Sequence, residues 1–270
     1  MNVVRADLQD RPVRVAVPVR VTFSGSTFLI KEFTANLSVG GIFLQTDNMV
    51  EPGVEGHLTF RGSQWERPFT IRAVVVRAVP PNPESKQTPG LGLQFLEIDD
   101  ASRKSLQRLV NGIQDGSVVE AIRRSIREGA SRDLLEEIRK RPIDQRLMLA
   151  LQAAGEEIDA LIRDGNAVVI ERMMENPRLS VRHVRTISRD PRLPTQTLMA
   201  LRRQGRWISD EEVRFNFCSH RRAPIPDVLK MLDQLSVARL KQMTKNANLR
   251  PQVQTRAREL LRRQLRSGGV

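Results

Sequence analysis

The sequence contains one cysteine, Cys218, and three histidines among its 270 residues. A single thiol excludes an internal disulfide and is typical of a reducing compartment, so we expect a cytoplasmic protein. His57, His183 and His220 fall in separate segments, without the spacing of metal ligands. We therefore expect no metal site.

The sequence also lacks the patterns of a catalytic site. It contains no Walker loop, no G-x-S-x-G elbow and no H-E-x-x-H pair. Cys218 and His220 are two residues apart, but Phe215 and Phe217 share their segment, which favours a packing role over a catalytic dyad. The expectation is a protein that is not an enzyme and that uses no cofactor.

Long hydrophobic runs are missing as well. No segment approaches the roughly eighteen consecutive apolar residues of a membrane helix. The first ten residues include acidic side chains and no apolar core of the kind that a secretory signal needs. We expect a soluble protein without membrane insertion.

The charge is unevenly distributed along the chain. Lys and Arg number 44 against 31 Asp and Glu, but only 13 of these bases and 12 of these acids lie at or before residue 115. The basic excess of the remainder suits an acidic protein, nucleic acid or anionic lipid, or is simply a solvated helical surface. Aromatic residues make up 4% of the sequence, too few for extensive stacking on single strands, so an acidic protein partner is favoured over nucleic acid.

The first part of the sequence follows the pattern of β-strands. From Val13 to Phe60 apolar residues tend to alternate with polar ones, which is the period of a strand with one buried face. Further strands are expected over 71–79 and 91–95, and a helix capped by Asp99 or Asp100 is expected to end at Asn111-Gly112. Short strands without intervening helices indicate an antiparallel barrel or sandwich.

From Ser117 onward the sequence predicts only short helices, separated by Gly or Pro. These helices repeat when Ser180, Ser209 and Ser236 are aligned as helix caps, the segment from Ser209 to Glu212 forming a capping box. Each cap precedes an apolar residue by four positions and a proline by 14 or 15, at Val184, Val213, Leu240, Pro194, Pro224 and Pro251. Stacked helix pairs that resemble HEAT-like repeats are therefore expected.

A short motif in the strand-rich part carries the functional prediction. The segment NLSVGG, from Asn36 to Gly41, fits D/N-x-S-x-x-G, and Arg11 and Arg14 lie upstream, just before a strand. Downstream, the strand from Gly90 leads into a helix. Together these features resemble the PilZ family of cyclic di-GMP receptor domains over residues 10–112.

The resemblance implies a six-stranded antiparallel β-barrel with a C-terminal helix and a ligand site for cyclic di-GMP. Its expected site residues are Arg11, Arg14, Asn36, Ser38, Gly40 and Gly41. Arginine suits this ligand because a guanidinium binds a phosphate, or the O6 and N7 atoms of guanine, in a bidentate manner. The family pattern is R-x-x-x-R, whereas this chain has Asp10 four residues before Arg14. Arg20 is expected to face solvent.

We therefore predict a two-domain protein, β then α, with a PilZ-like barrel at 1–115 and an all-α helical-repeat domain at 116–270. Its expected function is that of a cyclic di-GMP receptor that signals through the basic helical domain to a macromolecular partner. One alternative is a degenerate PilZ domain that has lost nucleotide binding and acts as a protein interaction scaffold. Another is a nucleic-acid-binding protein that uses the basic helices.

Overall fold

The structure is a computed structural model that describes residues 12–65, 67–82 and 87–267 of the chain. Arg11 and Asp10 lie outside the described residues. The chain divides into two compact units: Met1–Arg132 with Lys140–Leu149, and Asp133–Arg139 with Ala150–Val270.

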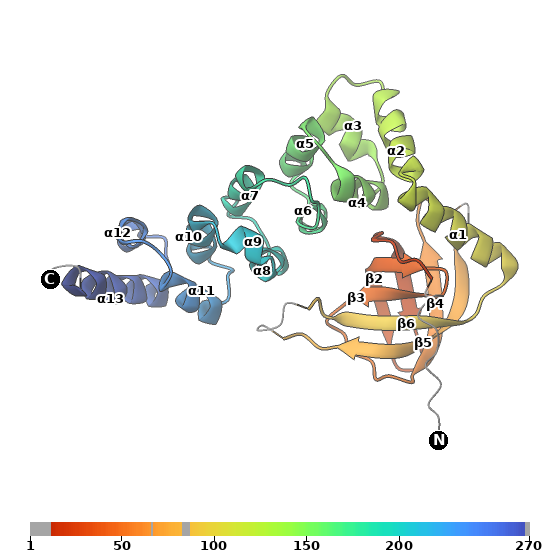
Figure 1. Cartoon of the computed structure of the whole chain (residues 1–270), viewed down its shortest axis with the longest axis horizontal. Helices are drawn as coiled ribbons and strands as arrows, with labels where there is room; N and C mark the ends of the chain where they lie inside the picture. The colour runs from red at the N-terminus through yellow and green to blue at the C-terminus, as the bar shows by residue number, and fades with distance from the viewer. Residues whose placement is uncertain (1–11, 66, 83–86, 268–270) are drawn as a thin grey trace, which may run out of the picture. The chain divides into compact units, whose positions relative to one another are not determined.

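Six antiparallel strands of the first unit close into a barrel in the order β1-β2-β3-β6-β5-β4 (Figure 1). The prediction of an antiparallel six-stranded barrel is thus confirmed. The strands are β1 (Arg20–Ser24), β2 (Leu29–Ser38), β3 (Gly41–Gln45), β4 (Glu55–Arg61), β5 (Phe69–Val79) and β6 (Gly90–Glu97).

The alternating valines before β1 fill the barrel core only from Val15 onward. Val15, Val17 and Val19 are buried, as the period of two predicts, but Val13 is 56% exposed. The first strand also begins at Arg20 and not at Val13, so the predicted start was wrong. Pro18 lies between Val13 and Arg20 and has no N–H to donate to a neighbouring strand. Regular pairing is interrupted there for that reason.

Thirteen helices are present among the described residues: α1 (Asp100–Gln114), α2 (Ser117–Arg127), α3 (Leu134–Lys140), α4 (Ile143–Gln152), α5 (Glu156–Asp164), α6 (Ala167–Met173), α7 (Val181–Ser188), α8 (Thr195–Arg203), α9 (Gly205–Ile208), α10 (Glu211–Ser219), α11 (Ile225–Leu232), α12 (Val237–Lys245) and α13 (Pro251–Ser267). Asp99 caps α1 by accepting from the Ser102 N–H, as expected. Helix α1 continues to Gln114, beyond the predicted end at Gly112. The all-helical character of the second part of the chain is confirmed.

Four loops of the second unit share one hydrogen-bonding pattern. In each, the N–H of the fourth loop residue donates to the carbonyl of the first, at 3.2–3.3 Å, and the fourth side chain is buried. The loops precede α7, α8, α11 and α13, and their bonds run from Leu179 to Asn176, Leu193 to Asp190, Ala223 to His220 and Leu249 to Asn246. This shared turn, together with helices that begin at or after Pro194, Pro224 and Pro251, is the structural repeat of the unit.

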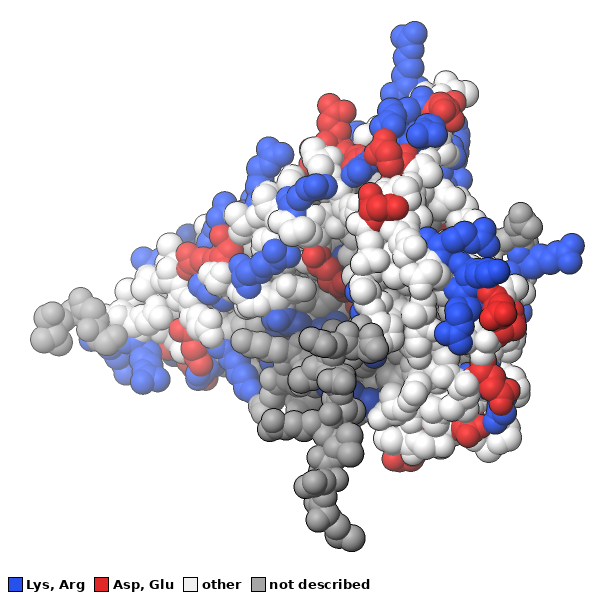
Figure 2. All heavy atoms as spheres, turned by 45° about the vertical axis from the view of Figure 1, so that its right-hand side comes forward, with Lys and Arg blue, Asp and Glu red and all other residues white. Residues whose placement is uncertain are grey.

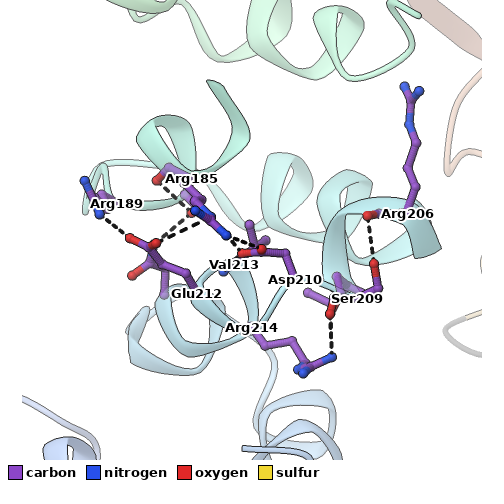
Figure 3. Close-up of polar contacts among 11 residues, drawn as sticks. Arg185, Arg189, Arg206, Ser209, Asp210, Glu212, Val213 and Arg214 are labelled. Atoms are coloured by element: carbon purple, nitrogen blue, oxygen red, sulfur yellow. Dashed lines mark hydrogen bonds and ion pairs between the residues drawn. The ribbon is translucent and has the colours of Figure 1, made fainter. Parts of the chain in front are cut away.

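Two of the three predicted helix caps are correct. Ser180 caps α7 and Ser236 caps α12 through their side-chain oxygens. Helix α10, however, is capped by Asp210, whose carboxylate accepts from the Val213 N–H, while the Ser209 hydroxyl donates to the Arg206 carbonyl (Figure 3). The predicted cap at Ser209 was wrong by one residue because two side chains capable of capping stand next to each other.

Candidate functional site

The extended segment before β1 lies against the end of β2. Val15 and Leu37 exchange backbone hydrogen bonds of 2.8 and 2.9 Å in an antiparallel bridge. A Cβ on Gly40 would lie 3.4 Å from the Pro12 side chain. The segment from Pro12 to Val15 therefore runs antiparallel to Leu37–Gly40, and this register places Arg14 opposite Ser38.

Thr34 fastens this segment to the barrel. Its hydroxyl donates to the Val17 carbonyl and accepts from the Val19 N–H at 2.9 Å, and its own N–H donates to the Val19 carbonyl at 2.9 Å. These bonds satisfy the backbone on either side of Pro18, where a regular ladder cannot form. Sequence reasoning missed Thr34, since a threonine is ordinary in a strand and nothing in the pattern marks its cross-strand partners.

Ser38 organises the turn between β2 and β3. Its side chain is buried, and its hydroxyl donates to the Gly41 carbonyl at 3.1 Å and accepts from the Gly40 N–H at 3.4 Å. The hydroxyl thus links the two ends of a two-residue turn, because Ser38 pairs with Gly41. The serine therefore sets the shape of the turn and presents little surface to a ligand.

Gly41 is required by the close approach of the neighbouring strand. It pairs with Gln94 of β6, and a Cβ at Gly41 would lie 2.4 Å from the Leu93 carbonyl oxygen. That distance is far below any normal contact between these atoms, so the backbone would have to shift. The glycine of the motif therefore allows β3 and β6 to pack at this point.

Asn36 supplies an unused polar group beside the turn. Its Oδ1 atom is shielded from solvent and has no hydrogen-bond partner among the described residues. The β2–β3 register shifts between Thr34 and Asn36, and such a bulge re-aims the side chains that follow it. A shielded acceptor without a partner is costly, and a donor from a ligand would satisfy it.

One cationic side chain borders the site on its exposed side. Arg14 is exposed and lies on the segment that borders the turn. Arg20 is not among the predicted site residues: its guanidinium is exposed, as predicted, and lies 5.4 Å from the centre of the Phe33 ring. Of the predicted site residues, the structure thus brings Arg14, Ser38, Gly40 and Gly41 to one turn, with Asn36 on the adjoining strand. Arg11, the remaining predicted site residue, lies outside the described residues.

Within residues 12–65, 67–82 and 87–267, no three His, Cys, Asp or Glu side chains are grouped as a metal would require. Over the same part of the chain, no helix combines the length and apolar character of a membrane-spanning segment.

Comparisons with known proteins bear on the barrel. Two solved structures are similar to parts of the chain: the inhibitor of motility MotI/DgrA of Bacillus subtilis, at 22% identity and a TM-score of 0.32, and the PilZ domain with c-di-GMP of YcgR from Escherichia coli, at 18% identity and a TM-score of 0.34. The matches cover 39% and 42% of this chain, and 53% and 97% of those chains, so only about half of the first is spanned. No curated protein matches the sequence. The family model described as the PilZ domain matches residues 8–112, the stretch that contains the closed barrel and the N-x-S-x-x-G turn, and this part of the chain is a PilZ domain.

Proposed function

We propose that this protein is a cytoplasmic, non-enzymatic receptor for cyclic di-GMP. PilZ domains form a family of cyclic di-GMP receptors, and residues 8–112 match that family. The observation that carries the proposal is the paired hydrogen bonding of Val15 with Leu37, which holds Arg14 beside the turn of the N-x-S-x-x-G motif. The ligand site consists of Arg11, Arg14, Asn36, Ser38, Gly40 and Gly41.

The chemistry of these groups matches the ligand. The guanidinium of Arg14 can bind a phosphate or the O6 and N7 atoms of guanine in a bidentate manner. The partnerless Oδ1 of Asn36 can accept from a guanine N–H. Ser38 and Gly41 act through the backbone, since they fix a turn that a ligand can approach closely.

The barrel at 1–115 is proposed to act as the sensor and the helical domain at 116–270 as the output. The output surface we assign is a row of exposed arginines on α13, Arg258, Arg262 and Arg266, which share one helix face because they are spaced by four residues. None of the three forms an ion pair within the described chain, so their charge is available to an acidic protein partner.

Many other arginines of the helical domain have structural partners, so the net charge overstates its free basic surface. Arg178, Arg222 and Arg250 donate to the carbonyls of Gln152, Arg192 and Ala223, at 2.6–2.8 Å. Figure 2 likewise shows Lys and Arg side chains interspersed with Asp and Glu on the face in view. A localised contact through α13 is therefore favoured over a general attraction to polyanions.

Calorimetric titration of cyclic di-GMP into the full chain tests the receptor proposal. We expect low-micromolar or tighter binding that Arg14→Ala weakens at least tenfold, since a charge-assisted hydrogen bond to the ligand is lost. Arg20→Ala is the matched control, because Arg20 is exposed on the same barrel but stacks on Phe33, and it should leave the affinity unchanged. Absence of heat at saturating ligand would overturn the receptor proposal in favour of the degenerate interaction scaffold, for which Asp10 is the motivating feature.

Nucleic acid remains the second candidate partner for the basic helices. Fluorescence anisotropy with a labelled duplex, measured over a salt series, distinguishes it from an acidic protein, since nucleic-acid affinity falls steeply with salt. Weak binding with a flat salt response is the expected result. Tight, salt-sensitive binding that is lost when Arg258, Arg262 and Arg266 are all changed to Glu would make nucleic acid the partner.

A further inference from the structure

The first unit contains a cleft of about 730 Å³ that shares no residue with the proposed cyclic di-GMP site. Its walls are the loop between β4 and β5 and one face each of α1, α2 and α4. Clefts of about 300–1,000 Å³ are the usual size for small-molecule sites. The cleft is therefore large enough for a ligand of its own.

Hydrogen bonds between distant segments hold the walls of the cleft in place. The buried carboxylate of Asp144, in the first turn of α4, accepts from both the N–H and the hydroxyl of Ser63 at 2.7 Å. The amide of Gln145 donates to the same hydroxyl at 3.2 Å. The β4–β5 loop is thereby tied to α4, which gives the cleft a preformed shape.

Small side chains keep the space open. Helix α1 contributes Ser102 and Ser105 to the cleft, and α2 contributes Ala121 and Ser125. Larger side chains at these positions would fill the volume between the helices and the loop. Below them, Leu109 and Met148 form part of an apolar floor.

One wall of the cleft is aromatic. Trp65 and Phe69 both line it and contact each other edge to face, with 5.3 Å between their ring centres. Trp65 is only partly buried, so part of its ring surface is available to a ligand. An apolar or aromatic ligand body would pack against these rings.

The charged side chains that line the cleft favour a negatively charged ligand. Arg67 and Arg108 line it, and neither forms an ion pair among the described residues; Arg108 makes one long hydrogen bond of 3.4 Å to Ser105. None of the described lining residues is acidic. Two guanidinium groups without an ion pair, and no carboxylate among the lining residues that the structure describes, favour an anion.

Gln64 adds an independent indication that the cleft takes a ligand. Both polar atoms of its side chain, Oε1 and Nε2, are shielded from solvent and find no hydrogen-bond partner in the part of the chain that is described. An amide that is shielded from solvent with neither its donor nor its acceptor satisfied is unfavourable, so a partner at this position would be stabilising. Gln64 lines the cleft, where a ligand can supply one.

From these observations we infer that the cleft between the β4–β5 loop and helices α1, α2 and α4 binds a small amphipathic anion. The ligand has an apolar or aromatic body, which packs on Trp65 and the apolar floor, and a carboxylate, sulfonate or phosphate, which pairs with Arg108 and Arg67. The site is separate from the turn of the N-x-S-x-x-G motif, so the two sites can be occupied independently.

Anilinonaphthalene sulfonate, a fluorescent aromatic anion, is a suitable probe for the full chain. The sequence contains only two tryptophans, so Trp207→Phe leaves Trp65 as the sole energy donor to the bound probe. We expect one probe per chain and quenching of Trp65 emission as the probe binds. The reciprocal variant, Trp65→Phe, should lose most of this energy transfer.

Two pairs of variants locate the probe. Ala121→Phe fills the cleft and should abolish binding, whereas Ala121→Ser keeps the space and should not. Arg108→Gln should weaken binding about tenfold, the effect of one charge-assisted hydrogen bond, while Arg103→Gln on the exposed surface of α1 should have no effect. Undiminished binding to the Ala121→Phe variant, or equal weakening by Arg103→Gln, would overturn the proposal, as would displacement of the probe by cyclic di-GMP.

Discussion

The guanidinium of Arg185 holds the carboxylate of Asp210 through two hydrogen bonds, of 3.1 and 2.6 Å, between α7 and the N-terminus of α10 (Figure 3). The same carboxylate caps α10 by accepting from the Val213 N–H at 3.1 Å. Glu212 extends the contact, because it pairs with both Arg185 and Arg189. Asp210 therefore caps α10 and also links α10 to α7.

Removal of this cap should destabilise the helical unit measurably. Asp210→Ala is expected to lower the free energy of unfolding by about 1–2 kcal/mol, because it removes a helix cap and leaves Arg185 with a weaker partner. Urea denaturation followed by circular dichroism measures the change. Ser209→Ala is the control, and should cost less than about 0.5 kcal/mol because its hydroxyl bonds only a nearby carbonyl. A larger loss of stability in Ser209→Ala than in Asp210→Ala would identify Ser209 as the cap.

The contribution of the Asp210 charge should depend on pH. The hydrogen bond from Arg185 lowers the pKa of the Asp210 carboxyl below its ordinary value. A lowered folded-state pKa gives stability that is fully present above the unfolded pKa and is lost as pH falls through the folded pKa. The wild type should therefore be more stable than the Asp210→Asn variant at neutral pH. This difference in the free energy of unfolding should disappear on acidification. Urea midpoints over a pH series measure it, and a gap that stays constant would contradict the ionic contribution.

Thr34 should matter through its hydroxyl and not through its shape. Thr34→Val keeps the volume but leaves the buried Val19 N–H and Val17 carbonyl without their partner, which costs about 1–3 kcal/mol. The same change should weaken cyclic di-GMP binding, since the segment that holds Arg14 loses its attachment. Thr34→Ser retains the hydroxyl and should keep most of the affinity. Thermal unfolding and calorimetry measure both effects, and identical behaviour of the two variants would rule out the role of the hydroxyl.

The sequence predicts the barrel well because its strands are half-buried and their apolar residues alternate. It fails where backbone pairing departs from that pattern, as at Pro18, where the valines stay buried although the strand is interrupted. It also fails at Ser209 and Asp210, since both side chains can cap a helix and only the hydrogen bonds from Arg185 to Asp210 distinguish them. Hydrophobic periodicity predicts which face of a strand or helix is buried. It does not predict which polar atoms form hydrogen bonds.

The candidate site was predictable only in part for the same reason. The spacing of Asn36, Ser38 and Gly41 located the turn, and the order of segments placed Arg14 near it. The Ser38 hydroxyl bonds the Gly41 carbonyl, and the Thr34 hydroxyl bonds the Val17 carbonyl. Both bonds join different segments of the barrel, so no local sequence pattern predicts them. The cleft beside α1 was missed entirely, because its lining comes from four separate segments.

Cys218 should be inert in the folded protein. The thiol is buried, and burial raises its pKa to about 12, so almost no thiolate is present at neutral pH. Because the thiolate is the reactive form, a disulfide reagent such as Ellman's reagent should label the native protein at least a hundredfold more slowly than the urea-unfolded protein. The unfolded protein serves as the control for reagent quality. Rapid labelling under native conditions would show that the segment around α10 opens readily.

Gly41 and Gly40 provide a matched test of the turn that the proposed receptor site is built on. Gly41→Ala would place a Cβ 2.4 Å from the Leu93 carbonyl oxygen, and since backbone atoms cannot move aside cheaply, we expect a loss of about 1–3 kcal/mol in stability. Gly40→Ala places its Cβ 3.4 Å from the Pro12 side chain, so it should cost less than the change at Gly41. Thermal unfolding of both variants measures the difference. If the two lose stability equally, the close packing of β3 on β6 is not what requires glycine in the motif, and the requirement must then come from the ligand side of the turn.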